Sequence, residues 1–316
     1  MRKIIIDCDP GHDDAVALIL ATRAKNFQIL GVTAVAGNSI LENTARNALD
    51  VLAFADAEEI PVYAGCSSPL KRPLHNNSGV KVHGINGLGN KKIETSTRRP
   101  EKMHATDFIT ETLRKAEEKI TLVCLGPLTN IAQAFLKEPA CKEKVESIVI
   151  MGGAVYAPGN VNSAAEFNFF IDPEAAQIVI NSGCKIYLNA LDVTMKALFY
   201  KKDIERLEEH ERGKLSRLVG GLLWLYAGTY EEEMGFFACP VHDAVCIAAL
   251  LRPELVSYEQ VCVEVSTQGI TAGESVADFS GAWGRKPNVW LGKKIDSKGF
   301  VKLVTRAVSA PRGSFV

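Results

Sequence analysis

Short apolar runs alternate with helical patterns along the first two thirds of this 316-residue chain. The run "KITLVCLG" is apolar throughout, as expected of a strand that is covered on both faces. Because strands that alternate with helices pair in parallel, the pattern predicts a parallel sheet with right-handed crossovers. The expected strands are 3–7, 27–37, 119–126, 145–153 and 184–191, and the expected helices are 15–24, 44–56, 128–139 and 172–183.

The last third of the chain is more helical, and no repeat, low-complexity tract or linker interrupts it. We expect helices at 201–209, 214–233, 242–252 and 296–308, with short strands at 261–266 and 287–291. The sequence therefore predicts an α/β fold in which residues 1–316 form a single domain, with a mostly parallel twisted sheet and helices on both faces.

Composition is that of a soluble globular protein, with 47% apolar and 23% charged residues. The net charge of −1 gives no global field toward nucleic acid or membrane, so neither is expected as a partner. The amino-terminal apolar run is too short for a signal-peptide core. The eight cysteines are scattered without a C-x-x-C pair, which favours reduced thiols in a cytoplasmic protein over disulfides or zinc.

Two stretches depart from a plain alternation of strands and helices. Residues 66–103 read as one long irregular segment rich in Lys and Arg, and residues 155–173 insert polar groups between a strand and a helix. A loop as long as 66–103 is usually functional or disordered. Because no aromatic stacking pattern accompanies its charge, a solvated loop is favoured over an RNA contact.

The stretch "IIIDCDPGHDDAVALIL" places Asp7, Asp9, Asp13 and Asp14 between two apolar runs. Two like charges about 5 Å apart repel by roughly 3 kcal/mol at an effective dielectric constant of about 20. The positive end of the following helix favours anions but cannot offset four of them. Oxygen ligands select Ca²⁺ or Mg²⁺, so the cluster indicates a metal site. The alternative is a pair of helix caps with two solvated acids.

Other polar groups are expected at the same edge of the sheet, where open α/β folds bind ligands. Asn38 follows one strand, and the turn at Gly126-Pro127 leaves the Leu125 carbonyl available to a cation. Far downstream, "CPVHDAV" places His242 and Asp243 at the start of a helix. Asp243 is equally well read as an ordinary helix-terminal acid, and His242 as a partly buried histidine.

The acids and amides together suit a neutral polyol. Glu166 and Asn168 lie two apart in "AEFN", and Asn38 and Asn160 add further amides. A phosphate is disfavoured because the cluster is acidic and has no G-K-[ST] loop. The residues thus indicate metal-assisted chemistry, in the first place hydrolysis, of a hydroxylated substrate. A haloacid-dehalogenase-like phosphatase, suggested by "IIIDCD", and a non-catalytic protein that binds such a hydroxylated compound are the alternatives.

The motifs "DCDPGHDD", "VAGN", "LGPLTN", "IVIMGGA", "AEFN" and "PVHDA" resemble the inosine-uridine-preferring nucleoside hydrolase family, in order over nearly the whole chain. The resemblance implies hydrolysis of the N-glycosidic bond of ribonucleosides to ribose and free base. It also implies one Ca²⁺ per subunit and a homo-oligomer, either a dimer or a tetramer.

Matching positions then imply a role for each residue of the site. The implied Ca²⁺ ligands are Asp9, Asp14, the Leu125 carbonyl and Asp243. Asp9 would also deprotonate the attacking water, and Asp7 would support the metal site. The implied ribose contacts are Asp13 and Asn168 at the 2′-hydroxyl, Asp243 at the 3′-hydroxyl, Asn160 and Glu166 at the 5′-hydroxyl, and Asn38 and Met151 in the pocket wall.

The base end of the pocket is less well encoded. His242 matches the branch of the family in which a histidine faces the leaving base, and His83 matches a loop histidine that closes over it. Tyr226, Tyr230 and Met234 are candidate base-facing groups at helical spacing, and Tyr230 could donate to a purine. Tyr226 fits a helical core face at least as well. We expect a pyrimidine or a mixed inosine and uridine preference, with the residue that protonates the base left open.

Overall fold

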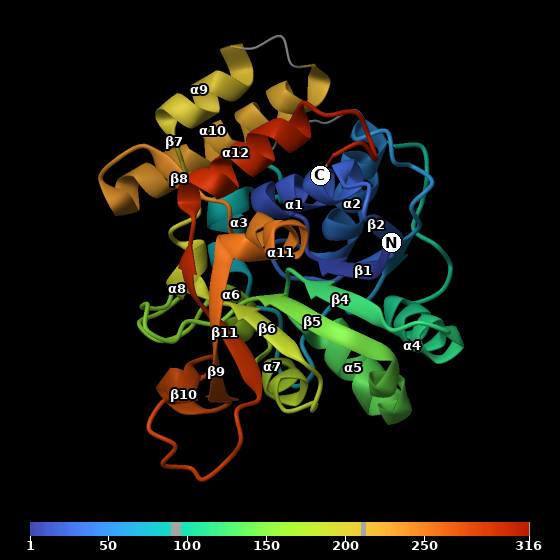
Figure 1. Cartoon of the computed structure of the whole chain (residues 1–316), viewed down its shortest axis with the longest axis vertical. Coiled ribbons are helices and arrows are strands. Elements are labelled where there is room, and N and C mark those ends of the chain that lie inside the picture. Colours follow the sequence, from blue (N-terminus) through green and yellow to red (C-terminus); the bar gives the residue numbers. More distant parts are fainter. Residues whose placement is uncertain (90–95, 210–212, 316) are drawn as a thin grey trace.

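The computed structural model describes residues 1–89, 96–209 and 213–315. Within them, nine strands form one sheet, which crosses the middle of the molecule in Figure 1. Across the sheet the order is β10 (Ser275–Asp278), β9 (Val256–Val265), β11 (Val289–Ile295), β6 (Ile186–Asn189), β5 (Val145–Met151), β4 (Ile120–Cys124), β1 (Arg2–Cys8), β2 (Phe27–Ala34) and β3 (Val62–Ala64). All pairs from β11 to β3 are parallel, whereas β9 pairs antiparallel with both β11 and β10. The predicted single-domain, mostly parallel α/β fold is confirmed.

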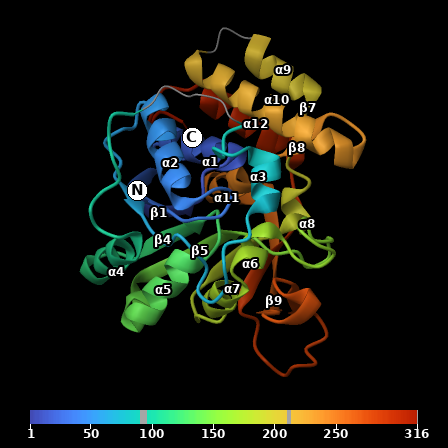
Figure 2. The same cartoon turned by 180° about the vertical axis from the view of Figure 1, so that it is seen from behind.

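Helices cover both faces of the sheet, as Figures 1 and 2 show from opposite sides. One face carries α1 (His12–Arg23), α2 (Leu41–Phe54), α10 (Lys214–Met234), α11 (His242–Leu251) and α12 (Ser297–Val308). The other face carries α4 (Ala105–Lys115), α5 (Thr129–Lys137) and α7 (Pro173–Ile180). Strand β1 serves both cores, since Ile4 and Ile6 lie in the first and Ile5 in the second. Each such buried isoleucine stabilises the fold by about 1.5–3 kcal/mol.

Smaller elements complete the chain. They are α3 (Asn77–His83), α6 (Phe167–Ile171), α8 (Leu191–Thr194), α9 (Lys201–Glu209), the antiparallel pair β7 (Leu198–Tyr200) and β8 (Ala238–Pro240), and 3₁₀ turns at Pro139–Lys144, Pro253–Leu255 and Gly269–Thr271. All eight cysteines are free, and all but Cys184 are buried, as predicted. In the described part of the chain, no helix combines the length and the apolarity needed to cross a bilayer.

The prediction that residues 66–103 are irregular throughout is wrong over α3. The helix is stabilised by tertiary contacts that cannot be recognised from its own seven residues. Val82 packs against the main core, and His83 is 6% exposed. Part of the basic charge of the segment pairs within the molecule, since Arg72 donates to Glu174 at 2.6 and 3.0 Å. Residues 90–95 of the segment lie outside the described residues.

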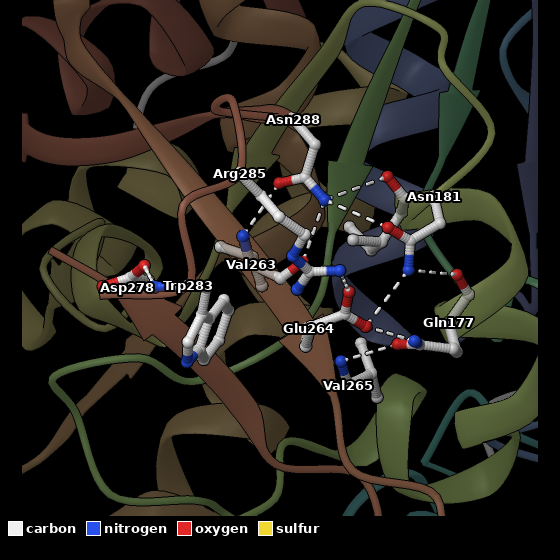
Figure 3. Close-up of polar contacts among 10 residues, drawn as sticks. Gln177, Asn181, Val263, Glu264, Val265, Asp278, Trp283, Arg285 and Asn288 are labelled. Carbon is white, nitrogen blue, oxygen red and sulfur yellow. Dashed lines mark hydrogen bonds and ion pairs between the residues drawn. The ribbon is translucent and has the colours of Figure 1, made fainter. Parts of the chain in front are cut away.

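Side chains fasten the antiparallel edge of the sheet to the parallel part, as Figure 3 shows. Asn288 pairs with the backbone of Val263 through both ends of its amide, at 2.8 and 2.9 Å. Gln177 of α7 accepts from the Val265 backbone at 2.7 Å and also donates to Glu264. This edge therefore forms a fixed scaffold at the opposite end of the sheet from β1, β2 and β4.

Candidate active site

The carboxyl ends of β1, β2, β4 and β5 lie side by side in the sheet, so the acidic segment and the polar loops meet at one edge. Asp7, the penultimate residue of β1, is 1% exposed. Its Oδ1 accepts from the Thr33 hydroxyl at 2.5 Å and from the Asn130 amide at 2.8 Å. Asp7 is therefore held beneath the site by side chains of β2 and α5 rather than by solvent.

Asp9 has one engaged and one unengaged oxygen. Its Oδ2 accepts the Asn38 backbone N–H at 2.7 Å, whereas its Oδ1 is buried without a hydrogen-bond partner among the described residues. A Cβ at either Gly37 or Gly126 would collide with this carboxylate. The two glycines thus leave room around Asp9, and its orphaned oxygen is the kind of atom that a cation would satisfy.

Asp14 lies at the start of α1, where its carboxylate accepts backbone N–H groups of Gly11 at 2.9 Å and Asp9 at 3.2 Å. Side-chain oxygens of Asp13, Asp14 and Asp243 all lie within 4.8 Å of one another, and all three residues are buried. The first turn of α1 and the first turn of α11 therefore bring these three acids together from positions more than 200 residues apart in sequence.

Burial dominates the electrostatics of the cluster. It raises the pKa of Asp7 to about 7 and, with repulsion from Asp14, raises the pKa of Asp13 to about 8. Burial and the neighbouring aspartates hold the pKa values of Asp9 and Asp243 well above the usual range. So many carboxylates in one dry site call for a positive charge, and an all-oxygen donor set fits a hard divalent cation.

The Leu125 carbonyl faces Asn168, whose amide nitrogen donates to it at 2.8 Å and to the Met151 carbonyl at 3.1 Å. A carbonyl oxygen has two lone pairs, so this bond leaves one for a further partner. The Leu125 N–H in turn donates to the Asp7 carbonyl at 2.8 Å. The loop after β4 is therefore tied both to β1 and to the segment that carries Asn168.

Glu166 caps the short helix α6. Its carboxylate accepts the backbone N–H groups of Asn168, Gly153 and Phe169 at 2.9, 2.8 and 3.2 Å, and burial raises its pKa to about 7. Asn160 accepts the Phe167 N–H at 2.9 Å. Both residues therefore shape the loop as well as presenting polar atoms to the pocket.

Histidines and tyrosines form the opposite end of the site. The Nε2 of His242 lies 3.1 Å from the Tyr230 hydroxyl, and its Nδ1 lies 2.8 Å from the Thr194 hydroxyl. Burial lowers the pKa of His242 to about 3, so the imidazole is neutral. His83 contacts His12 and is likewise buried, which holds its pKa well below the usual range.

One pocket joins these two ends. Its walls include every ribose-contact or base-contact residue expected from the sequence, namely Asp13, Asn38, His83, Met151, Asn160, Glu166, Asn168, Tyr230, His242 and Asp243, together with Leu125. Asp9 and Asp14 lie outside this wall and contact it through Asn38. The side chain of Met234 lies outside the described residues.

The structure adds residues to this wall that the sequence did not assign. They are Gly79, Val82, Val161, Phe167 and Thr229. Tyr226, an equally good core residue by its spacing, is 2% exposed and lines the pocket as well. Helical spacing from Tyr226 could have suggested Thr229, whereas Val82 and Phe167 enter through segments whose conformation depends on tertiary contacts.

Fold and pocket together define an α/β protein with an acidic, polar pocket at the carboxyl edge of its sheet. The model of the inosine-uridine preferring nucleoside hydrolase family matches residues 4–302. The chain belongs to that family and is a ribonucleoside hydrolase, an enzyme that hydrolyses N-glycosidic bonds. This identification decides against the phosphatase and the non-catalytic alternatives.

Curated relatives and solved structures agree over the whole chain. The pyrimidine-specific ribonucleoside hydrolase RihA of Escherichia coli O1:K1 is 40% identical, over 95% of this chain and 96% of its own. RihB of Escherichia coli O157:H7, also called pyrimidine-specific, is 39% identical over 97% of both chains. The plant nucleoside hydrolase PpNRh1 superimposes with a TM-score of 0.93 at 33% identity over 98% of this chain and 99% of its own. A purine-preferring ribonucleoside hydrolase from Gardnerella vaginalis superimposes with a TM-score of 0.91 at 30% identity over 98% of both chains.

Proposed function

We propose that this chain hydrolyses ribonucleosides with one Ca²⁺ per subunit, held by Asp9, Asp14, the Leu125 carbonyl and Asp243. The observation that carries the proposal is the orphaned, fully buried Oδ1 of Asp9 beside a group of buried carboxylates. When bound, the ion would supply Lewis acidity to a water molecule and a grip on neighbouring ribose hydroxyls. Ca²⁺ is favoured over zinc because every donor is a carboxylate or carbonyl oxygen.

Asp9 is the proposed general base. The Asn38 N–H fixes Oδ2 of its carboxylate at 2.7 Å, so the unpartnered Oδ1 keeps a set direction while it accepts the proton of the attacking water. Asp7 sits behind it, anchored by Thr33 and Asn130. The surrounding carboxylates would stabilise the positive charge that develops on the ribosyl group as the bond to the base breaks.

Ribose binding is the proposed task of the polar wall. Asp13 and Asn168 would take the 2′-hydroxyl, Asp243 the 3′-hydroxyl, and Asn160 with Glu166 the 5′-hydroxyl, while Asn38 and Met151 line the pocket. Because the amide nitrogen of Asn168 is engaged by Leu125 and Met151, its carbonyl oxygen is the atom proposed to face the sugar. Fixing the ring in this way can supply several kcal/mol of the barrier, on the order of 7 or more for ideal alignment.

Assistance to the leaving base is the proposed task of the opposite end of the pocket. His242 and Tyr230 form a hydrogen-bonded pair there. When the neutral imidazole carries its proton on Nε2 and donates to the Tyr230 hydroxyl, that hydroxyl can donate its own hydrogen to the departing base. His83 closes the same end from α3. A pyrimidine or mixed inosine and uridine preference is proposed, and its pyrimidine part is supported by the two Escherichia coli relatives, RihA and RihB, whose names call them pyrimidine-specific.

We also propose a cytoplasmic homo-oligomer, either a dimer or a tetramer. Eight free cysteines, seven of them buried, suit a reducing compartment. Exposed Tyr156, Phe279 and Trp283 offer apolar surface for a subunit contact. Light scattering on the purified protein, coupled to gel filtration, distinguishes a monomer from a dimer or a tetramer.

A reducing-sugar assay across inosine, adenosine, uridine and cytidine tests the proposal, with and without a calcium chelator. We expect ribose release that is fastest on uridine or cytidine, is lost on chelation and returns with Ca²⁺. Asp9→Ala is expected to abolish turnover. Wild-type rates in that variant, or rates indifferent to the chelator, would remove Asp9 or calcium from the proposed chemistry.

A further inference from the structure

The proposed chemistry gives no task to His12, although this residue is 1% exposed and its ring contacts His83 and Tyr226, which line the pocket. His12 is the first residue of α1. Its ring stacks on that of Tyr226 with centroids 5.3 Å apart and on that of His83 with centroids 5.0 Å apart. Three elements that are distant in sequence, α1, α3 and α10, therefore meet at this one side chain.

Two nitrogen atoms of His12 approach the same nitrogen of His83. The His12 backbone N lies 3.2 Å from Nδ1 of His83, and the His12 ring Nδ1 lies 2.8 Å from it. A backbone N–H can only donate, so Nδ1 of His83 must accept and carries no proton. The Nδ1 of His12 must then be a donor too. His83 is thereby fixed as the neutral tautomer with its proton on Nε2.

The backbone around both histidines allows the ring of His83 to lie close to His12. A Cβ at Gly11 would lie 2.7 Å from Nδ1 of His83, so only a glycine at that position lets the ring come this close. Gly84, at a φ of 75°, ends α3 directly after His83, and the Gly89 N–H donates to the His83 carbonyl at 2.7 Å. His83 is therefore held from its backbone as well as from its ring.

We propose that His12 is a positioning residue that fixes His83 with its Nε2–H as a hydrogen-bond donor to the departing base. This inference rests on the proposed function, because it gives that proton a use only when a base leaves. The electron pair of the glycosidic bond passes to the base as the bond breaks, so a donor beside the base binds most strongly in the transition state. The donor fits bases with an acceptor next to the glycosidic nitrogen, such as the C2 carbonyl of a pyrimidine.

Three variants of His12 test the proposal. Asn places an amide nitrogen where Nδ1 lies, Phe keeps the ring stack without a donor, and Gln places its amide nearer the position of Nε2. With uridine, we expect His12→Phe and His12→Gln to lower kcat about 10- to 100-fold, with little change in KM, and His12→Asn to recover most of the loss. With p-nitrophenyl riboside, whose leaving group needs no donor, all three should stay within about threefold of the wild type.

The His83→Ala background separates positioning from general damage. If His12 acts through His83, adding His12→Phe to His83→Ala should change kcat on uridine by less than about twofold. Losses that multiply in the double variant, or equal losses on uridine and p-nitrophenyl riboside, would overturn the proposal.

A ¹⁵N NMR spectrum of histidine-labelled wild-type protein tests the tautomer without any turnover. We expect His83 to show a protonated Nε2 and an unprotonated Nδ1, and the reverse assignment would overturn the proposal even if every variant behaved as expected. A wild-type enzyme that releases no ribose would instead sink the proposed function, whatever the spectrum shows.

Discussion

The Thr194 hydroxyl lies 2.8 Å from Nδ1 of His242, on the opposite side of the imidazole from the Tyr230 hydroxyl, which lies 3.1 Å from Nε2. Thr194 ends α8, and His242 begins α11, so two short stretches of chain set the angle of one ring. Since a hydroxyl can donate or accept, Thr194 can follow either tautomer of His242 while it keeps the ring in place. Thr194 therefore holds the ring of His242, the residue proposed to assist the departure of the base.

Thr194→Val tests that support because it keeps the shape of the side chain and removes only the hydroxyl. The change leaves a buried imidazole nitrogen without its partner, at a cost of about 1–3 kcal/mol. We expect kcat/KM on uridine to fall about tenfold or more, with a smaller loss on p-nitrophenyl riboside. Thr194→Ser keeps the hydroxyl and should stay near the wild type. Unchanged kinetics of the valine variant would show that the ring is held by other contacts.

Calcium removal should lower thermal stability, because it leaves the carboxylates of Asp9, Asp13 and Asp243 buried without a counter-charge. Saturation at about 100 times the dissociation constant corresponds to about 2.7 kcal/mol of added stability. We expect a chelator to lower Tm and Ca²⁺ to restore it, with a reduced calcium shift in Asp9→Asn. Asp56→Asn, at an exposed position, is the matched control and should keep the full shift. A calcium shift of normal size in Asp9→Asn would take Asp9 out of the metal site.

Glu166 gives stability a defined pH dependence. Burial raises its pKa from an ordinary 4.5 to about 7, so the folded state keeps the proton in a range where the unfolded state has lost it. The contribution of Glu166 to the unfolding free energy must therefore fall as pH rises from about 4.5 to about 7, by at most about 3 kcal/mol, and stay level above that. Glu166→Gln has no such proton and should lack this slope.

Urea unfolding of both proteins at several pH values between 4.5 and 8, with calcium held constant, measures the difference. The stability of Glu166→Gln relative to the wild type should rise across this range, on top of a constant offset for its altered hydrogen bonds. Glu146→Gln, at an exposed position of β5, controls for the loss of a carboxylate. Parallel profiles for the Glu166 variant and the wild type would contradict the raised pKa.

The acidic half of the site could be predicted from the local sequence. The half that contains the histidines depends on contacts between distant segments of the chain. Asp9 and Asp14 are five residues apart around a Pro-Gly turn, so their neighbourhood can be read from the chain itself. His12 and His83 are 71 residues apart, and Thr194 and His242 are 48 apart. Helices α3 and α8 span 7 and 4 residues, which is too short for a helical period to be recognised in the sequence.

The sheet shows the same division. Continuous apolar runs predicted β1, β4 and β5, because a strand that is buried on both faces can be recognised from its own apolar residues. The four-residue strand β10 was not predicted, since residues 275–278 show neither an apolar run nor an alternating pattern and form a strand by pairing with β9. The mostly parallel order thus follows from strand composition, and its antiparallel edge from side chains such as Asn288 that fasten the edge to its neighbours.

Gly37→Ala should damage the site without a change in any polar group. A Cβ at Gly37 would collide with the Asp9 carboxylate, which the Asn38 N–H holds in place, so backbone or carboxylate must move. A displacement of about 1 Å at a catalytic group can lower the rate on the order of 100-fold, and we expect such a loss in kcat/KM on uridine together with weaker calcium binding by titration calorimetry. Gly228→Ala is the matched control, since a Cβ there meets nothing within 4 Å and lies inside α10. It should leave activity unchanged and stabilise the fold by about 0.5–1 kcal/mol. Wild-type kcat/KM and calcium affinity in Gly37→Ala would mean that the carboxylate of Asp9 has room to shift without loss, and that its close enclosure by glycine is not required.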